Sequence, residues 1–168
     1  MKINMTFIRL IMLPILLLAG CGYAEQEATA LYDQALTLKS DKNLLEAKAK
    51  YEQVVRDYSD TEIAVQAKKD LIELEELLDQ MRKKAEADIM AMGNAITLYY
   101  LDTSALPKTL DDLVIQPEGI TSWLGYLTTI PRDPWDMPYR YKLEDNAYQI
   151  SSNGADGLPE TPDDIKSE

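Results

Sequence analysis

The longest hydrophobic pattern of the chain lies between Thr61 and Asp102. This stretch has no proline and one glycine, Gly93, so nothing in it forces a helix to break. Apolar or small residues recur in it every three or four positions: Leu71, Leu74, Leu78, Met81, Ala85, Ile89, Met92, Ile96 and Tyr99. This spacing predicts one long α-helix with a continuous apolar stripe. At about 1.5 Å per residue the helix would be on the order of 60 Å long, so we expect two modules to share it.

Two shorter helical patterns precede the long helix. The first ends in the turn-forming run 39–43, and the second ends at 57–60. Ser59 or Asp60 is expected to cap the long helix, because a short side-chain oxygen can accept from the free amide groups of a first turn. The apolar or small positions of the two patterns are Leu31, Ala35, Leu38, Leu44, Ala47, Tyr51, Val54 and Val55. Two helices cannot bury such faces alone, so the start of the long helix should pack on both.

This helix pair resembles a tetratricopeptide repeat (TPR). Ala47 and Tyr51 have the A-x₃-F spacing of the repeat, and Ala35 occupies the small position of its first helix. Leu31 replaces the usual tryptophan, and Ser59 replaces the usual closing proline. Only one repeat is covered, and a plain helical hairpin is the alternative.

The last third of the chain changes from helical to strand-like patterning. Pro107 ends the long helix, and Leu110 to Leu113 form a short helical turn. Further on, apolar and polar residues alternate over 139–142 and again over 148–150, with the turn sequence Glu144-Asp145-Asn146 between them. This pattern predicts a β-hairpin with one buried face.

The first twenty residues have the features of an export signal. Lys2 and Arg9 flank a charge-poor start, and the apolar run from Leu10 to Ala19 is too short to span a membrane as a stable helix. The run ends in Leu18-Ala19-Gly20-Cys21, which resembles the lipobox of bacterial lipoproteins. That resemblance implies removal of residues 1–20 and a lipid on Cys21. An ordinary secretory signal with a chance or buried cysteine is the alternative. Cys21 is the only cysteine, so no disulfide can form within the chain.

The charge balance narrows the range of partners. The chain has 17 Lys and Arg against 29 Asp and Glu, for a net charge of −12. Such an acidic balance disfavours nucleic acid and anionic lipid surfaces. Membrane attachment would therefore come from acyl chains and not from a basic face. In enteric bacteria Asp after the lipidated cysteine retains a lipoprotein in the inner membrane. Gly22 stands there, which favours the periplasmic face of the outer membrane.

The sequence predicts no catalytic residue, and we expect that the protein is not an enzyme. It has no histidine, and its one cysteine belongs to the lipobox. It contains no glycine-rich phosphate loop and no nucleophile motif. The acidic pair Asp111-Asp112 is explained by solvent exposure rather than by acid–base chemistry.

The second half of the chain resembles the major pseudopilin (protein G) of type II secretion. The shared residues occur in the family's order: Ala87-Asp88-Ile89, Ala95, Tyr99, Leu101-Asp102, Leu106-Pro107, Thr109-Leu110, Leu113, Gly125-Tyr126-Leu127, Pro131, Asp133-Pro134-Trp135, Pro138-Tyr139, Tyr141, Ser152, Gly154-Ala155-Asp156-Gly157 and Asp163-Asp164-Ile165. The resemblance implies an α+β fold in which a long helix packs on a small antiparallel sheet. It also implies a calcium ion in the C-terminal loop. We interpret Asp133, Pro134 and Trp135 as a structural turn whose tryptophan folds into the core.

The loop residues support calcium independently of the resemblance. Ser152, Asp156, Asp163 and Asp164, with backbone carbonyls, offer the hard oxygen ligands that this ion prefers. Gly154 and Gly157 allow tight turns between them. The alternative is an acidic, mobile tail. The glycine-rich stretch of the family is shortened here to the sequence Leu-Pro-Glu-Thr-Pro at 158–162.

Together these patterns predict four segments. Residues 1–20 form a lipoprotein signal peptide, 21–26 a tether, 27–80 a TPR-like helical module, and 81–168 a pseudopilin-like domain. Pseudopilins keep an apolar helix after their cleavage site, whereas the apolar run here precedes Cys21 and would be discarded.

The functional hypothesis that follows is a lipid-anchored envelope protein. It would be a non-enzymatic accessory or interaction component of a type II secretion or pilus-like system, with protein partners from that system. The alternative is a structural or scaffold lipoprotein that binds proteins through the TPR-like module, without a role in secretion. The stripe of the long helix could also form a coiled-coil seam with a second copy of the chain.

Overall fold

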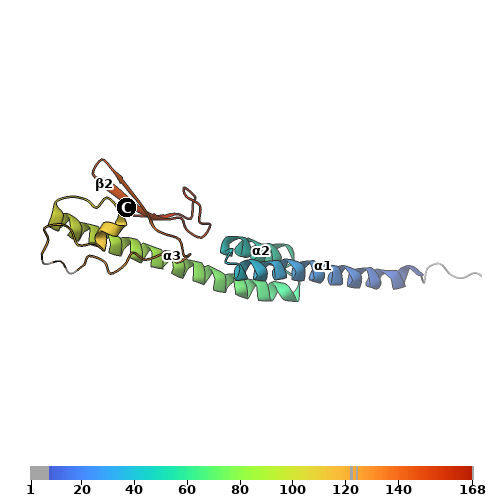
Figure 1. Cartoon of the computed structure of the whole chain (residues 1–168). Helices are drawn as coiled ribbons and strands as arrows, with labels where there is room; N and C mark the ends of the chain where they lie inside the picture. Colours follow the sequence, from blue (N-terminus) through green and yellow to red (C-terminus); the bar gives the residue numbers. More distant parts are fainter. Residues whose placement is uncertain (1–7, 122, 124, 168) are drawn as a thin grey trace, which may run out of the picture. The chain divides into compact units, whose positions relative to one another are not determined.

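The computed structural model describes residues 8–121, 123 and 125–167, with side chains from Gly22 onward (Figure 1). The chain divides into two compact units, Met1–Glu76 and Leu77–Glu168. The described residues combine three α-helices with a three-stranded antiparallel sheet, so the expected α+β class is confirmed.

The first unit consists of helices. They are α1 (Ile8–Ser40), α2 (Leu44–Asp57) and the beginning of α3 (Glu62–Thr103). The long helix is confirmed, because α3 covers the expected stretch to within one residue at each end. The buried apolar side chains of this unit are Ala28, Ala35, Leu44, Ala47, Tyr51, Val54, Ala64, Ala67 and Leu74. Buried alanines on all three helices permit close packing. A plain three-helix arrangement would have the same contacts, so the resemblance to a tetratricopeptide repeat stays a prediction.

Polar contacts tie α1 and α2 to the start of α3. The Tyr32 hydroxyl donates to the Asp70 carboxylate, and Lys48 lies 3.1 Å from Glu75. The Glu25 carboxylate accepts from the backbone amides of Glu62 and Ile63, each at 3.2 Å. A carboxylate at this place satisfies free amide groups and complements the positive end of the helix dipole.

The capping residue of α3 differs from the prediction of Ser59 or Asp60. The residue that caps the helix is Thr61, whose hydroxyl oxygen accepts from the amide of Ala64 at 3.3 Å. The prediction was wrong because Ser59 and Asp60 lie in the preceding turn. Only Thr61 immediately precedes the first helical residue.

The segment 21–26, expected as a tether, is helical and continuous with α1. Ala24, Glu25 and Gln26 are good helix formers, and the bond from Glu25 to α3 favours the same conformation. Within the part of the chain that the structure describes, no helix combines the length and the apolar character needed to cross a bilayer.

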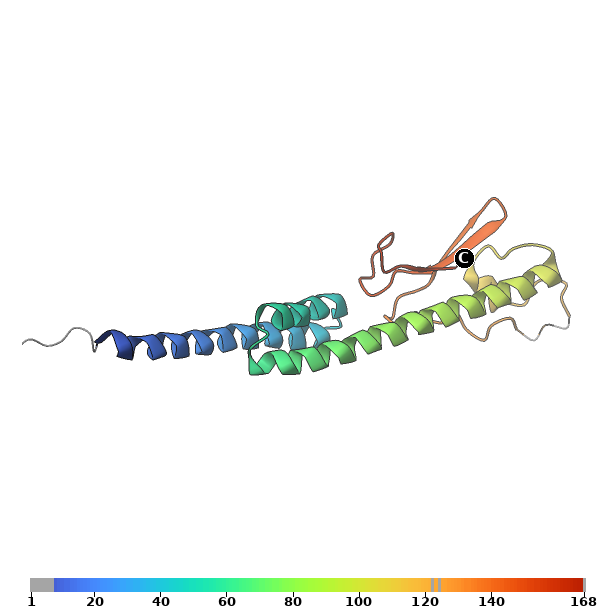
Figure 2. The same cartoon turned by 180° about the vertical axis from the view of Figure 1, so that it is seen from behind.

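The sheet of the second unit has the order β1-β2-β3. Its strands are β1 (Arg140–Glu144), β2 (Ala147–Ser152) and β3 (Ile165–Lys166), and both pairs are antiparallel. Asp145 and Asn146 connect β1 to β2 with φ angles of 48° and 63°. Two central residues with positive φ are typical of the type I′ turn that matches strand twist. The predicted β-hairpin is therefore confirmed, and Figure 2 shows it in orange beside the C-terminal part of α3.

One apolar cluster joins the sheet to α3. It contains Ala85, Ile89, Met92, Ala95 and Ile96 of α3, Leu110 and Leu113 of the short 3₁₀ helix η1 (Leu110–Leu113), and Tyr139, Ile150 and Ile165 of the sheet region. The predicted helical turn at 110–113 is thus present, and both of its leucines point into the core. Gly93 of α3 lies beside Tyr148, and a Cβ there would make an ordinary van der Waals contact with the tyrosine hydroxyl at 3.5 Å.

Candidate functional site

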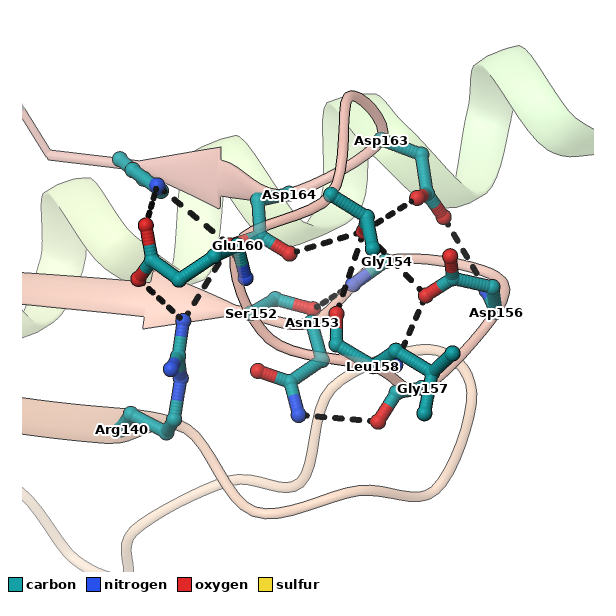
Figure 3. Close-up of polar contacts among 12 residues, drawn as sticks. Arg140, Ser152, Asn153, Gly154, Asp156, Gly157, Leu158, Glu160, Asp163 and Asp164 are labelled. Atoms are coloured by element: carbon teal, nitrogen blue, oxygen red, sulfur yellow. Dashed lines mark hydrogen bonds and ion pairs between the residues drawn. The ribbon is translucent and has the colours of Figure 1, made fainter.

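The loop between β2 and β3 gathers the predicted metal ligands of the aspartate type (Figure 3). Its tightest point is Gly154, which has a φ of +68°. A Cβ at Gly154 would lie 2.4 Å from both the carbonyl oxygen and the carboxylate Oδ2 of Asp163. Only glycine therefore lets the two ends of the loop meet, and this close approach brings Asp163 beside Asp156.

Three carboxylates converge on the hydroxyl of Thr161. Its Oγ1 lies 2.8 Å from Asp163 Oδ1 and 3.3 Å from the Oδ1 atoms of Asp156 and Asp164. The carbonyl oxygen of Leu158 lies 3.1 Å from the same atom. A hydroxyl has one hydrogen and can donate fully to only one of these four acceptors. The arrangement therefore brings an oxygen of each of three carboxylates to one hydroxyl.

The remaining polar contacts orient the carboxylates. Asp163 Oδ2 accepts from the amides of Ala155 and Asp156 at 2.6 and 3.1 Å, and Asp156 Oδ1 accepts from the amide of Leu158 at 2.7 Å. Asp164 Oδ2 accepts from the amide of Glu160 at 3.0 Å.

Two basic side chains also reach the buried carboxylate of Asp164, whose side chain is 1% exposed. Arg140 Nη2 lies 3.2 Å from its Oδ2, and Lys166 Nζ lies 3.5 Å from the same atom. These two cations pair with Oδ2 of Asp164, whereas its Oδ1 faces the Thr161 hydroxyl.

Hydrogen bonding keeps the loop carboxylates charged. Burial raises the pKa of Asp163, but the Thr161 hydroxyl and the Asp156 and Ala155 amides lower it by more, so its pKa lies below the ordinary value. Burial likewise raises the pKa of Asp164, and the Glu160 amide and Lys166 reverse that effect. Both groups are therefore anionic at neutral pH.

The donor chemistry of the loop fits a calcium ion. Three carboxylate oxygens and one carbonyl oxygen lie within 3.3 Å of the Thr161 hydroxyl oxygen, and calcium takes oxygen ligands of these kinds. In the described residues, no group of three or more acidic, histidine or cysteine side chains forms a preformed metal cage. Binding would therefore need the Thr161 hydroxyl to turn its hydrogen away from the carboxylates.

The structure separates Ser152 from the other predicted ligands. Its hydroxyl donates to Asp133 Oδ2 and accepts from the amide of Gly154 at 3.1 Å. Thr161 takes the central place instead, and the sequence reasoning missed it. A usable signal was its hydroxyl within the shortened stretch 158–162, between Asp156 and Asp163.

The predicted structural motif forms a tight turn around Asp133. The Asp133 side chain is buried, and its Oδ1 accepts from the amides of Trp135 and Met137 at 3.0 and 2.8 Å. Its Oδ2 accepts from Ser152, which links the turn to the end of β2. Trp135 packs against the apolar cluster. The Asp133 carboxylate thus holds two segments of the backbone together.

Cys21, the predicted lipid-attachment residue, belongs to α1 by its backbone. Its side chain lies outside the described part of the chain, as do the side chains of the predicted signal peptide.

Comparisons with known proteins match the second unit. Residues 73–168 match the family described as "Type II secretion system (T2SS), protein G". The core protein G of this system from Xanthomonas campestris pv. campestris is 38% identical over 79 residues, which cover 45% of this chain and 55% of that protein. The corresponding protein of Aeromonas hydrophila is 36% identical over 94 residues, covering 50% and 66%.

A solved structure also matches. It is the major pseudopilin from the type 2 secretion system of enterohaemorrhagic Escherichia coli, with 30% identity and a TM-score of 0.43. The match covers 52% of this chain and 86% of that one. The chain spans less than two thirds of the two relatives from Xanthomonas and Aeromonas, and residues 1–72 lie outside the family match.

Substituting the two loop glycines should separate backbone strain from close packing. Both have positive φ, so Gly157→Ala should destabilise the fold by about 1–2 kcal/mol through strain alone. Gly154→Ala adds the overlap with Asp163 and should cost clearly more. Urea unfolding of the two variants measures the difference. Equal losses would contradict the close approach at Gly154.

Proposed function

Because the chain belongs to the family of type II secretion system (T2SS), protein G, we propose that it acts in the cell envelope as a non-enzymatic accessory or interaction component of a type II secretion or pilus-like system. The observation that carries this proposal is the match of 73–168, the residues that build the hairpin and its helix. The relatives from Xanthomonas and Aeromonas are named as core proteins of that system.

The helical unit supports an accessory role rather than that of a fibre subunit. Ala64, Ala67 and Leu74 on the first part of α3 are buried. Their apolar faces are used inside the protein's own core. An apolar stem like that of pseudopilins would instead leave these positions for packing against neighbouring subunits. We infer that this part of the helix packs within the helical unit and does not contact neighbouring subunits of a fibre.

The proposed attachment is a lipid on Cys21, at the periplasmic face of the outer membrane. The support is the lipobox-like sequence 18–21 and the net charge of −12, which gives no electrostatic attraction to anionic lipids. A single acyl chain binds membranes only weakly, so stable attachment requires more than one chain.

The second candidate is a scaffold lipoprotein that binds proteins through the helical unit. A shallow groove of about 510 Å³ between α1 and α2 favours it. Asp33 and Gln34 of α1 and Glu46 and Lys50 of α2 lie along this groove and offer polar contacts for a peptide.

Photo-crosslinking in intact cells separates the two candidates. A crosslinking amino acid would replace Met90 or Leu101 in the second unit, or Val65 in the first, because all three side chains are more than half exposed. We expect crosslinks from positions 90 or 101 to secretion or pilus components, identified by mass spectrometry. Crosslinks from position 65 alone, to proteins outside such systems, would favour the scaffold.

We propose that Asp156, Asp163, Asp164 and the Thr161 hydroxyl hold a structural calcium ion. Among the described residues, Asp164 alone of the three aspartates forms ion pairs, and the calcium ion would add positive charge beside Asp156 and Asp163. Ligand binding to the folded state alone stabilises by about 2.7 kcal/mol when the free ion is at 100 times its dissociation constant. The thermal midpoint should therefore rise with millimolar calcium and fall with a chelator.

The matched variants for calcium are Asp156→Asn and Asp145→Asn. Each removes one carboxylate, but Asp145 lies in the β1–β2 turn, away from the loop. The response to calcium should be lost in Asp156→Asn and kept in Asp145→Asn. A wild-type protein that does not respond, or an unchanged response in Asp156→Asn, would remove the site.

Metabolic labelling tests the anchor. Wild-type protein should incorporate labelled palmitate and fractionate with outer membranes, whereas Cys21→Ala should do neither. Gly22→Asp is the control, since it keeps the cysteine and should move the labelled protein to the inner membrane. Label that persists in Cys21→Ala would disprove attachment at this residue.

A further inference from the structure

The outer edge of β1 carries unpaired backbone groups. In the part of the chain that the structure describes, β1 pairs only with β2 and forms one edge of the sheet. The two-residue turn makes Glu144 and Ala147 a hydrogen-bonded pair, and such pairs alternate along an antiparallel ladder. Tyr141 and Leu143 therefore direct their N–H and C=O groups away from β2. A backbone edge of this kind is a template for another extended chain.

A groove of about 410 Å³ adjoins β1. Pro138, Tyr139 and Tyr141 line it together with residues 108–111 and residues 130–132. The groove therefore lies beside β1, at whose outer edge the backbone groups have no partner among the described residues.

Hydrogen bonds hold the lining of the groove in place. The Tyr141 hydroxyl donates to the carbonyl of Pro107 at 2.8 Å and so ties β1 to the residue that precedes Lys108. Asp112 accepts from the amides of Lys108 and Thr109 at 2.7 and 3.0 Å, and Tyr139 donates to Asp88 at 3.0 Å. A groove whose walls are already ordered loses little conformational freedom when it is occupied.

The charges of the groove favour an acidic occupant. Among the described residues that line it, Lys108 and Arg132 are basic, and Asp111 alone is acidic. Within the described residues, Lys108 has no ion pair, and Arg132 lies 3.8 Å from Asp136, an exposed carboxylate. The lining is therefore net positive in a chain whose net charge is −12.

We propose that this groove binds an extended, acidic segment of a partner protein, which adds as a fourth strand to the free edge of β1. The backbone of the segment pairs with Tyr141 and Leu143, and its carboxylates face Lys108 and Arg132. Strand addition of this type takes its affinity from main-chain hydrogen bonds and its specificity from alternate side chains. A second copy is a poorer occupant, because pairing two β1 edges brings the lysine and arginine of both grooves together.

Nuclear magnetic resonance on the ¹⁵N-labelled full chain tests the proposal. The probe is a short, capped peptide in which valine alternates with glutamate, and the matched control peptide alternates valine with lysine. We expect the acidic peptide to shift the amide resonances of Tyr141 and Leu143 and to slow their hydrogen exchange. The control peptide should leave both unchanged.

Two variants test the two kinds of contact separately. Leu143→Pro removes one outward N–H and keeps the β1–β2 ladder, because proline is tolerated on edge strands. Lys108→Glu reverses one rim charge at an exposed site and should weaken peptide binding by about fivefold. Lys142→Glu is the control, because Lys142 pairs with Glu144 and does not line the groove.

Several outcomes would overturn the proposal. These are equal binding of the two peptides, shifts confined to another surface, and unchanged binding in both Leu143→Pro and Lys108→Glu. Shifts at the β1 edge that grow with protein concentration without any peptide would assign the edge to a second copy instead. Retained dispersion of the remaining resonances confirms that each variant is folded.

Discussion

The burial of one apolar stripe on α3 determines where the other elements of the second unit lie. Ile89, Met92 and Ile96 recur at helical spacing, and side chains from η1, β1, β2 and β3 all contact this cluster. None of these elements is long enough to be stable alone, since β3 has two residues and η1 has four. Short strands and single helical turns gain their stability from such packing rather than from intrinsic propensity.

Once the stripe is covered, polar groups fix the segments that connect the elements. Asp133 joins its turn to Ser152 at the end of β2, and the next residues form the loop around Thr161. The carboxylate of Asp133 and those of the loop differ in how their oxygens are hydrogen-bonded. Asp133 accepts from two amides and one hydroxyl of its own, whereas each of the three loop aspartates, besides its other partners, directs one oxygen at the single hydroxyl of Thr161. Three carboxylates around one hydroxyl repel one another, which is the physical argument for the proposed cation in the loop.

The sequence was sufficient to predict those helices and turns that are determined by residues close together in the chain. The helical period from Leu71 to Tyr99 predicted α3, and Asp145-Asn146 predicted the hairpin turn. Contacts between distant residues were not visible in the same way. The sequence could not show that Ser152 would bond to Asp133, or that Thr161 would lie among three aspartates, because both depend on how β2 and β3 pack.

The contact of Glu25 with α3 has a consequence for how the first unit opens. Helix ends normally fray independently, because their first amides have no partners within the helix. Here the Glu25 carboxylate of α1 accepts hydrogen bonds from the amide groups of Glu62 and Ile63 in α3. Unwinding α1 around Glu25 would therefore also remove an acceptor from the first amides of α3. The middle of α1 and the beginning of α3 are thus coupled, and a protease cut near Glu25 would leave the Thr61 hydroxyl as the remaining cap of α3.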